Sequence, residues 1–94
     1  MKIIDRRKSL ETCTESGWDA FDLLIDEPLT DDMIRRLSAI GGSFIYMSML
    51  KKPFFKVESH YYVVKGLKGD EHFRVAVHKD YLSEIDRIVD LINR

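Results

Sequence analysis

The chain has 94 residues, of which 45% are hydrophobic, 11% aromatic and 33% charged, and its formal net charge is −1. This length supports one domain with one hydrophobic core and is too short for two domains that each bury their own. The near-neutral charge removes the simplest argument for a nucleic-acid-binding protein, which is a strongly basic domain held by phosphate electrostatics.

The N-terminal stretch MKIIDRRKSLETC is too polar for a secretory leader, which needs an apolar run of about 7 to 15 residues. Its charges are at Lys2, Asp5, Arg6, Arg7 and Lys8. No later stretch approaches the roughly 18 apolar residues of a membrane span, and a single cysteine, Cys13, cannot form an internal disulfide. We therefore expect a cytoplasmic protein without membrane contact, in which residues 1–16 add an extra edge strand or form a flexible arm.

Residues 18–29, WDAFDLLIDEPL, predict the first strand. Phe21, Leu23 and Ile25 follow the two-residue period of a half-buried strand. Pro28 ends the strand, because proline has no backbone N–H to donate to a sheet.

A short helix is predicted next. Thr30 occupies the N-cap position, and Asp31 and Asp32 complement the helix dipole in the first turn. The apolar stripe of this helix consists of Met33, Ile34, Leu37 and Ile40. Gly41 and Gly42 end it, because the position after a helix favours the left-handed region.

Three further strands are predicted over residues 43–50, 54–65 and 72–78. In the middle one, the expected core face is Phe55, Val57, Ser59, Tyr61 and Val63. In the last one, it is Phe73, Val75 and Val77. Asp80 is then expected to cap a final helix. The apolar positions of this helix are Leu82, Ile85, Ile88, Val89 and Ile92.

The resulting element order is β-α-β-β-β-α across a single domain. We expect an α+β, two-layer sandwich with a mostly antiparallel four-stranded sheet and two helices packed on one face. The first strand, the first helix and the second strand would form a right-handed crossover, and the last three strands a meander.

All three histidines lie in the hairpin of residues 54–65 and 72–78. A three-residue loop at 67–69 would align the two core faces, with Tyr62 opposite Arg74 in a cation–π pair and Glu58 opposite His78. The same register places Val64 opposite His72 and His60 opposite Ala76. Glu58, His60 and His78 are then candidates for a metal site or for acid–base chemistry. We favour a solvated polar face and expect neither a metal nor a cofactor.

The strand 43–50 suggests a functional surface. If Ile45, Met47 and Met49 face the core, an apolar patch remains on the opposite face of the sheet. The expected partner-binding residues are Phe44, Tyr46, Leu50, Phe54, Tyr62, Val64 and the basic Arg74, Lys51 and Lys52. The competing interpretation is that the N-terminal segment or a second helix layer covers this patch.

We predict a non-enzymatic protein-interaction module, which is a homodimer or an adaptor or inhibitor of a larger protein. An acidic segment at 15–32 and a lysine-rich segment at 51–68 would steer its partner. The alternative is single-stranded nucleic-acid binding, in which Phe44, Tyr46, Phe54 and Tyr62 stack on bases. A small enzyme built on Glu58, His60 and His78 is the third hypothesis.

Overall fold

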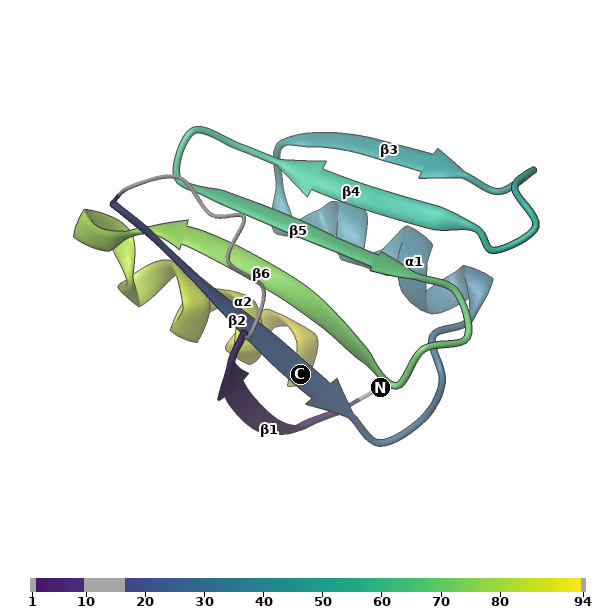
Figure 1. Ribbon diagram of the computed structural model, residues 1–94, viewed down its shortest axis with the longest axis horizontal. Helices are drawn as coiled ribbons and strands as arrows, with labels where there is room; N and C mark the ends of the chain where they lie inside the picture. Colours follow the sequence, from purple (N-terminus) through teal and green to yellow (C-terminus); the bar gives the residue numbers. More distant parts are fainter. Residues whose placement is uncertain (1, 10–16, 94) are drawn as a thin grey trace.

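The computed structural model of the chain describes residues 2–9 and 17–93. An antiparallel sheet forms one layer and two α-helices form the other (Figure 1). The elements are β1 (Ile3–Lys8), β2 (Trp18–Ile25), α1 (Asp31–Leu37), the 3₁₀ turn η1 (Ser38–Ile40), β3 (Ser43–Met47), β4 (Phe54–Glu58), β5 (Tyr62–Leu67), β6 (His72–His78), the 3₁₀ turn η2 (Lys79–Tyr81) and α2 (Ser83–Asn93).

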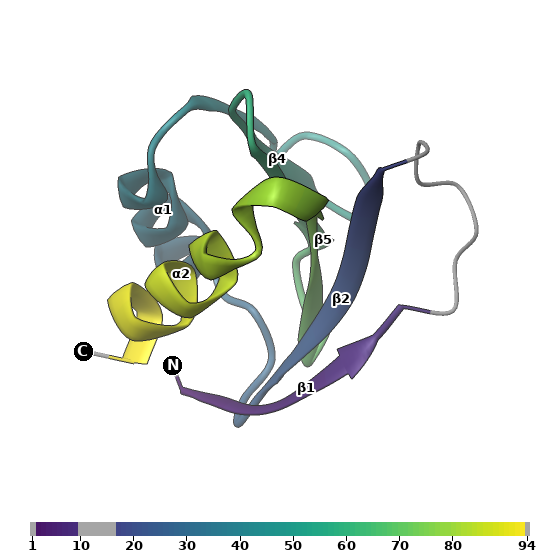
Figure 2. The same ribbon diagram turned by 90° about the vertical axis from the view of Figure 1, so that its left-hand side faces the viewer.

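The six strands lie in the order β1-β2-β6-β5-β4-β3, and each pairs antiparallel with its neighbour. Both helices cover the same face, which we call the helix face, and we call the other the open face (Figure 2). The predicted α+β class with helices on one face is therefore confirmed, but within the described ranges the sheet has six strands rather than four. One extra strand is the predicted edge strand near the N-terminus, and the other comes from a division of residues 54–65.

A turn at residues 59–61 divides the predicted strand 54–65 into β4 and β5. The Ser59 N–H donates to the Tyr62 carbonyl oxygen at 2.9 Å and closes this turn. Three turn residues reverse the strand and change the phase of the alternation, so Phe55 and Val57 are buried on β4 but Tyr62 and Val64 on β5. The predicted core face with odd-numbered residues throughout is therefore wrong beyond Val57.

The pairing of β5 with β6 also differs from the prediction. Tyr62 pairs with Val77 and Val64 with Val75, three positions away from the predicted partners Arg74 and His72. This register places buried apolar side chains of both strands on the helix face. Arg74 lies on the open face, so the predicted cation–π pair with Tyr62 does not form.

Local signals at the helix ends are partly confirmed. The Met33 N–H donates to Thr30 Oγ1 at 3.3 Å, which is the predicted N-cap of α1, and Gly41 follows η1 with a φ of 103°. Asp80 is not the cap of the last helix, because it lies inside η2. There its N–H donates to His78 Nδ1 at 3.2 Å.

The hydrophobic core lies between the sheet and the helices. Its fully buried larger side chains are Leu23, Ile25, Leu29, Ile34, Leu37, Phe55, Val57, Val64, Phe73, Val75, Ile85 and Ile88. Both α1 and α2 contribute to this cluster, so the two helices and the sheet share one core. Within the described ranges, no helix is long and apolar enough to cross a membrane.

The phase of β5 can be tested with one substitution at two adjacent positions. Val64 is fully buried on the helix face, whereas Val63 is half-buried on the open face. Val64→Thr should lower the free energy of unfolding by about 1–3 kcal/mol, because it buries a hydroxyl in an apolar site. Val63→Thr should change it by about 0.5 kcal/mol or less. Urea denaturation of both variants measures this, and equal losses would contradict the observed phase.

Candidate interaction surface

The predicted partner-binding patch is divided between the two faces of the sheet. Phe44 and Tyr46 pack against the core on the helix face, where Tyr62 and Val64 are buried. Phe54 lies half-buried on the open face, paired with Met47 and Leu67. Arg74 is buried on the open face, while Leu50, Lys51 and Lys52 follow β3 in an exposed turn. These residues therefore do not form the single surface that was predicted.

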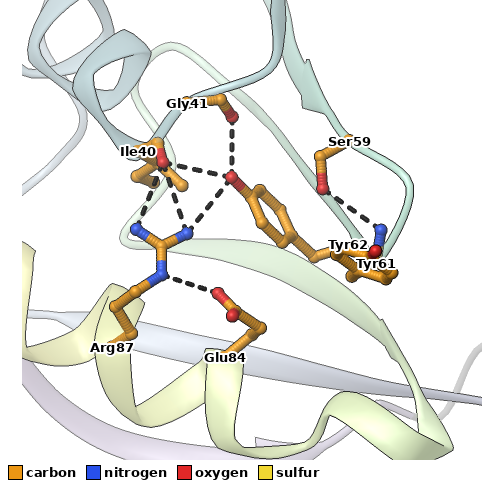
Figure 3. A network of polar contacts seen from close by, with 7 residues as sticks. All are labelled: Ile40, Gly41, Ser59, Tyr61, Tyr62, Glu84 and Arg87. Atoms are coloured by element: carbon orange, nitrogen blue, oxygen red, sulfur yellow. Dashed lines mark hydrogen bonds and ion pairs between the residues drawn. The ribbon is translucent and has the colours of Figure 1, made fainter.

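Tyr62 has a structural role (Figure 3). Its hydroxyl donates to the carbonyl oxygen of Gly41 at 2.8 Å and shares this hydrogen bond with the carbonyl oxygen of Ile40 at 3.1 Å. The same hydroxyl accepts a hydrogen bond from Arg87 Nη2 at 3.2 Å. Arg87 also donates to the Ile40 carbonyl oxygen, and its guanidinium lies 5.5 Å from the centre of the Tyr62 ring. Glu84 accepts from Arg87 Nε at 2.6 Å, and this bond is the main reason that the pKa of Arg87 is raised above its ordinary value. One side chain of β5 thus joins the end of η1 to α2.

Removing this hydroxyl should destabilise the protein. In Tyr62→Phe, the Gly41 carbonyl loses its donor and Arg87 loses an acceptor in a partly buried site. We expect the free energy of unfolding to fall by about 1–3 kcal/mol. The matched control is Tyr61→Phe, at the neighbouring position, whose side chain is 43% exposed. It should cost about 0.5 kcal/mol or less in the same denaturation experiment. Equal effects would show that the network is not important for stability.

The candidate metal or acid–base residues do not converge. Glu58 pairs with Val63, and Val63 pairs with Ala76, so a whole strand separates Glu58 from β6 and its predicted partner His78. His78 instead pairs with Trp18 and makes an edge-to-face contact with its ring, at 5.8 Å between centroids. Among the described residues, no three His, Cys, Asp or Glu side chains are grouped so as to hold a metal ion. Cys13 lies outside these residues.

Basic residues cross the open face in a single row. Lys56, Lys65 and Arg74 are consecutive register partners on β4, β5 and β6, followed by Asp22 on β2. The aromatic residues proposed for base stacking are mostly elsewhere, because Phe44, Tyr46 and Tyr62 lie on the helix face. The combination of stacking rings and phosphate-binding lysines on one surface, which the nucleic-acid alternative requires, is therefore not assembled.

Exposed apolar side chains gather on and just after β3, the strand at one edge of the sheet (Figure 1). Residues 37–50 contain no charged side chain. Ile45 and Met47 project from β3 on the open face and are 42% and 44% exposed, and Met49 and Leu50 in the following turn are 90% and 46% exposed. β3 is the last strand of the sheet, and within the described part of the chain nothing pairs with its outer side. We call these four side chains and the outer backbone of β3 the β3 edge.

The opposite edge has the reverse character. β1 has the sequence IIDRRK, whose charged residues are exposed, and its pairing with β2 is irregular between Ile3 and Asp5. Charged side chains and a bulge are the usual means by which proteins protect an edge strand from pairing with another chain. β3 has neither of these features.

Tyr46 fixes β3 to α1. Its hydroxyl donates to Asp31 Oδ1 at 2.6 Å, and the Arg35 guanidinium donates to Asp31 Oδ2 at 3.1 Å and lies 5.3 Å from the Tyr46 ring centre. The Tyr46 hydrogen bond, followed by the Arg35 bond, lowers the pKa of Asp31 below its ordinary value of 3.8. The same bond raises the pKa of Tyr46. The edge strand is therefore hydrogen-bonded to β4 on its inner side and to α1 on its helix-facing side.

This contact predicts a measurable titration. The Asp31 pKa should lie below 3.8 in the native protein and should rise toward that value in Tyr46→Phe, when its principal hydrogen bond is removed. Since the native pKa is the lower one, the contact contributes to stability above pH 3.8 and loses its effect as the pH falls through the native pKa. NMR titration of the Asp31 carboxyl carbon measures both values. Tyr81→Phe is the control that should leave the Asp31 pKa unchanged.

No protein-family model, curated protein or solved structure matches this chain. Of the predicted surface the β3 edge retains Leu50, while Phe44 and Tyr46 lie on the helix-facing side of the same strand. It adds Ile45, Met47 and Met49, which the sequence pattern assigned to the core. The absence of charge from residues 37–50 is the sequence signal that could have identified this edge.

Proposed function

We propose that this chain is a non-enzymatic protein-interaction module that binds another polypeptide along the β3 edge. The observation that carries the proposal is the contrast between the two ends of the sheet, one charged and irregular at β1, the other regular, apolar and uncharged at β3. An exposed edge of this kind is a template for an additional strand.

Edge addition would use both the backbone and the side chains of β3. An incoming strand would complete hydrogen bonds with the outward N–H and C=O groups, and its alternate side chains would contact Ile45 and Met47 on the open face. Because Tyr46 already fixes β3 to α1, little conformational freedom would be lost on binding. Lys51 at the end of the strand would favour an acidic group on the partner, whereas Lys52 is already paired with Asp70 at 3.1 Å.

The other two hypotheses have less support. Nucleic-acid stacking would need Phe44 and Tyr46 on the same face as Lys56 and Lys65. Enzymatic chemistry would need Glu58 and His78 within reach of one atom. A cytoplasmic setting remains our expectation, because the chain has a single cysteine.

A strand peptide tests the proposal directly. The peptide PFFKVES, which copies residues 53–59, should add to the outer side of β3, because β4 already pairs with its inner side. In dilute protein, NMR shift changes should be confined to residues 43–50. They should persist in high salt, since backbone and apolar contacts are weakly screened.

Two matched variants complete this test. Ile45→Lys places a protecting charge on the β3 edge and should weaken peptide binding at least about tenfold. Ile4→Lys makes the same change on β1, where Ile4 is 66% exposed, and should leave binding unchanged. No binding by the wild type, or equal loss in both variants, would refute an edge-binding function.

A further inference from the structure

We propose that the partner at the β3 edge is a second copy of this chain, paired antiparallel through a two-fold axis at Ile45. This inference rests on the proposed function and specifies its partner. The resulting dimer would have one continuous sheet of twelve strands, with the helices of both copies on the same side.

The register follows from the length of β3 and from the alternation of its side chains. Pairing centred on Ile45 matches all five residues of the strand, with Ile45 facing its own copy, Phe44 facing Tyr46 and Ser43 facing Met47. Residues that face each other then point to the same side of the combined sheet. Centring the axis on any neighbouring residue leaves part of the strand unpaired.

The absence of charge from β3 suits self-pairing in particular. A two-fold axis brings each side chain close to its own copy, so any charge near the axis would face a like charge and destabilise the pair. β4 and β1 could not pair with themselves in this way, because Lys56 and Arg6 are central to them. β3 is the strand at a sheet edge that carries no such penalty.

The side chains around the axis also complement one another. A hollow of about 400 Å³ at the start of β3 is lined by Gly42, Ser43, Glu58, Ser59 and His60. Met47 of the second copy would lie beside the small Ser43 on the open face, next to this hollow. An exposed thioether chain would thereby meet an unfilled depression, and by symmetry the contact forms twice.

Charge complementarity acts at the ends of the strand. Lys51 follows β3 at its C-terminal end, whereas Glu58, whose carboxylate also lies 3.7 Å from Lys56 Nζ, pairs with Ser43 at its N-terminal end. Antiparallel pairing brings the basic end of each copy to the acidic end of the other. On the helix face, the ring centroids of Phe44 and Tyr46 are 6.4 Å apart. In the dimer, Phe44 of each copy would lie beside Tyr46 of the other, so the aromatic contact would extend across the two-fold axis.

The size of the contact predicts a reversible dimer. A five-residue strand with its flanking side chains is smaller than the roughly 800 Å² per partner of a standard stable interface, so we expect a dissociation constant in the micromolar range. Sedimentation velocity over about a hundredfold range of concentration should show the mass rising from 11.0 kDa to twice that value. The rise should persist in high salt.

A charge swap at Ile45 tests the symmetry itself. Ile45→Lys and Ile45→Asp should each remain monomeric, because like charges would face each other across the axis. An equal mixture of the two should form a mixed dimer, since the axis then places Lys opposite Asp. Ile4→Lys on β1 is the matched control and should dimerise as the wild type does. Circular dichroism of each variant measures whether it is folded, and a variant that does not fold is not compared.

The outcomes separate this inference from the proposed function. Monomeric wild type at all concentrations would overturn self-pairing, as would a dimer that Ile45→Lys leaves intact. Failure of the mixture to associate would overturn the placement of the axis at Ile45. If the monomeric protein still binds the PFFKVES peptide at residues 43–50, edge binding stands and only the partner is wrong. If it binds neither itself nor the peptide, both proposals fail.

Discussion

The two faces of the sheet depend on which side chains of β5 point toward the helices, and on this strand Tyr62 and Val64 are the buried ones. Tyr62 is held between the carbonyl groups at the end of η1 and the guanidinium of Arg87, so it must point toward the helices. Strand pairing transfers this orientation to Val57 on β4 and then to Phe44 on β3. Alternation along β3 leaves Ile45 on the open face. The exposed apolar residues at the edge thus follow from the orientation of β5, which lies two strands away in the sheet.

Both ends of the sheet are fixed to helices, but by different means and with different surfaces. Arg6 of β1 forms a salt bridge with Asp86 of α2 at 3.0 Å, while Tyr46 of β3 bonds to Asp31 of α1. The edges differ in charge, and for the association that we propose this difference favours β3, where desolvation removes apolar surface from water rather than ionised groups.

Much of the fold was predictable because β6 and both helices have apolar residues at an uninterrupted period, and α1 has a clear N-cap. The sequence did not allow us to predict which alternate residues of β5 face the helices. Tyr61 and Val63 suit an inward face as well as Tyr62 and Val64 do, and the turn before them contains no glycine, proline or asparagine to reveal it. Both alternating sets of β3 are likewise apolar, so its inward face depends on pairing with β4. The contact between Tyr62 and Arg87 joins elements that are distant in the sequence, so no local pattern predicts it. The unpredicted phase of β5 and of β3 is why the sequence placed the candidate surface differently from the structure.

The two ends of the described chain lie close together, on the side of the molecule remote from β3. The Ile3 N–H donates to Asn93 Oδ1 at 2.7 Å, and β1 and β3 are at opposite ends of the sheet (Figure 1). A tag, surface tether or fused protein attached at either terminus would therefore leave the outer side of β3 unobstructed. Joining the ends with a short linker would create a circular chain, and new termini could be opened elsewhere without displacing either helix from the core.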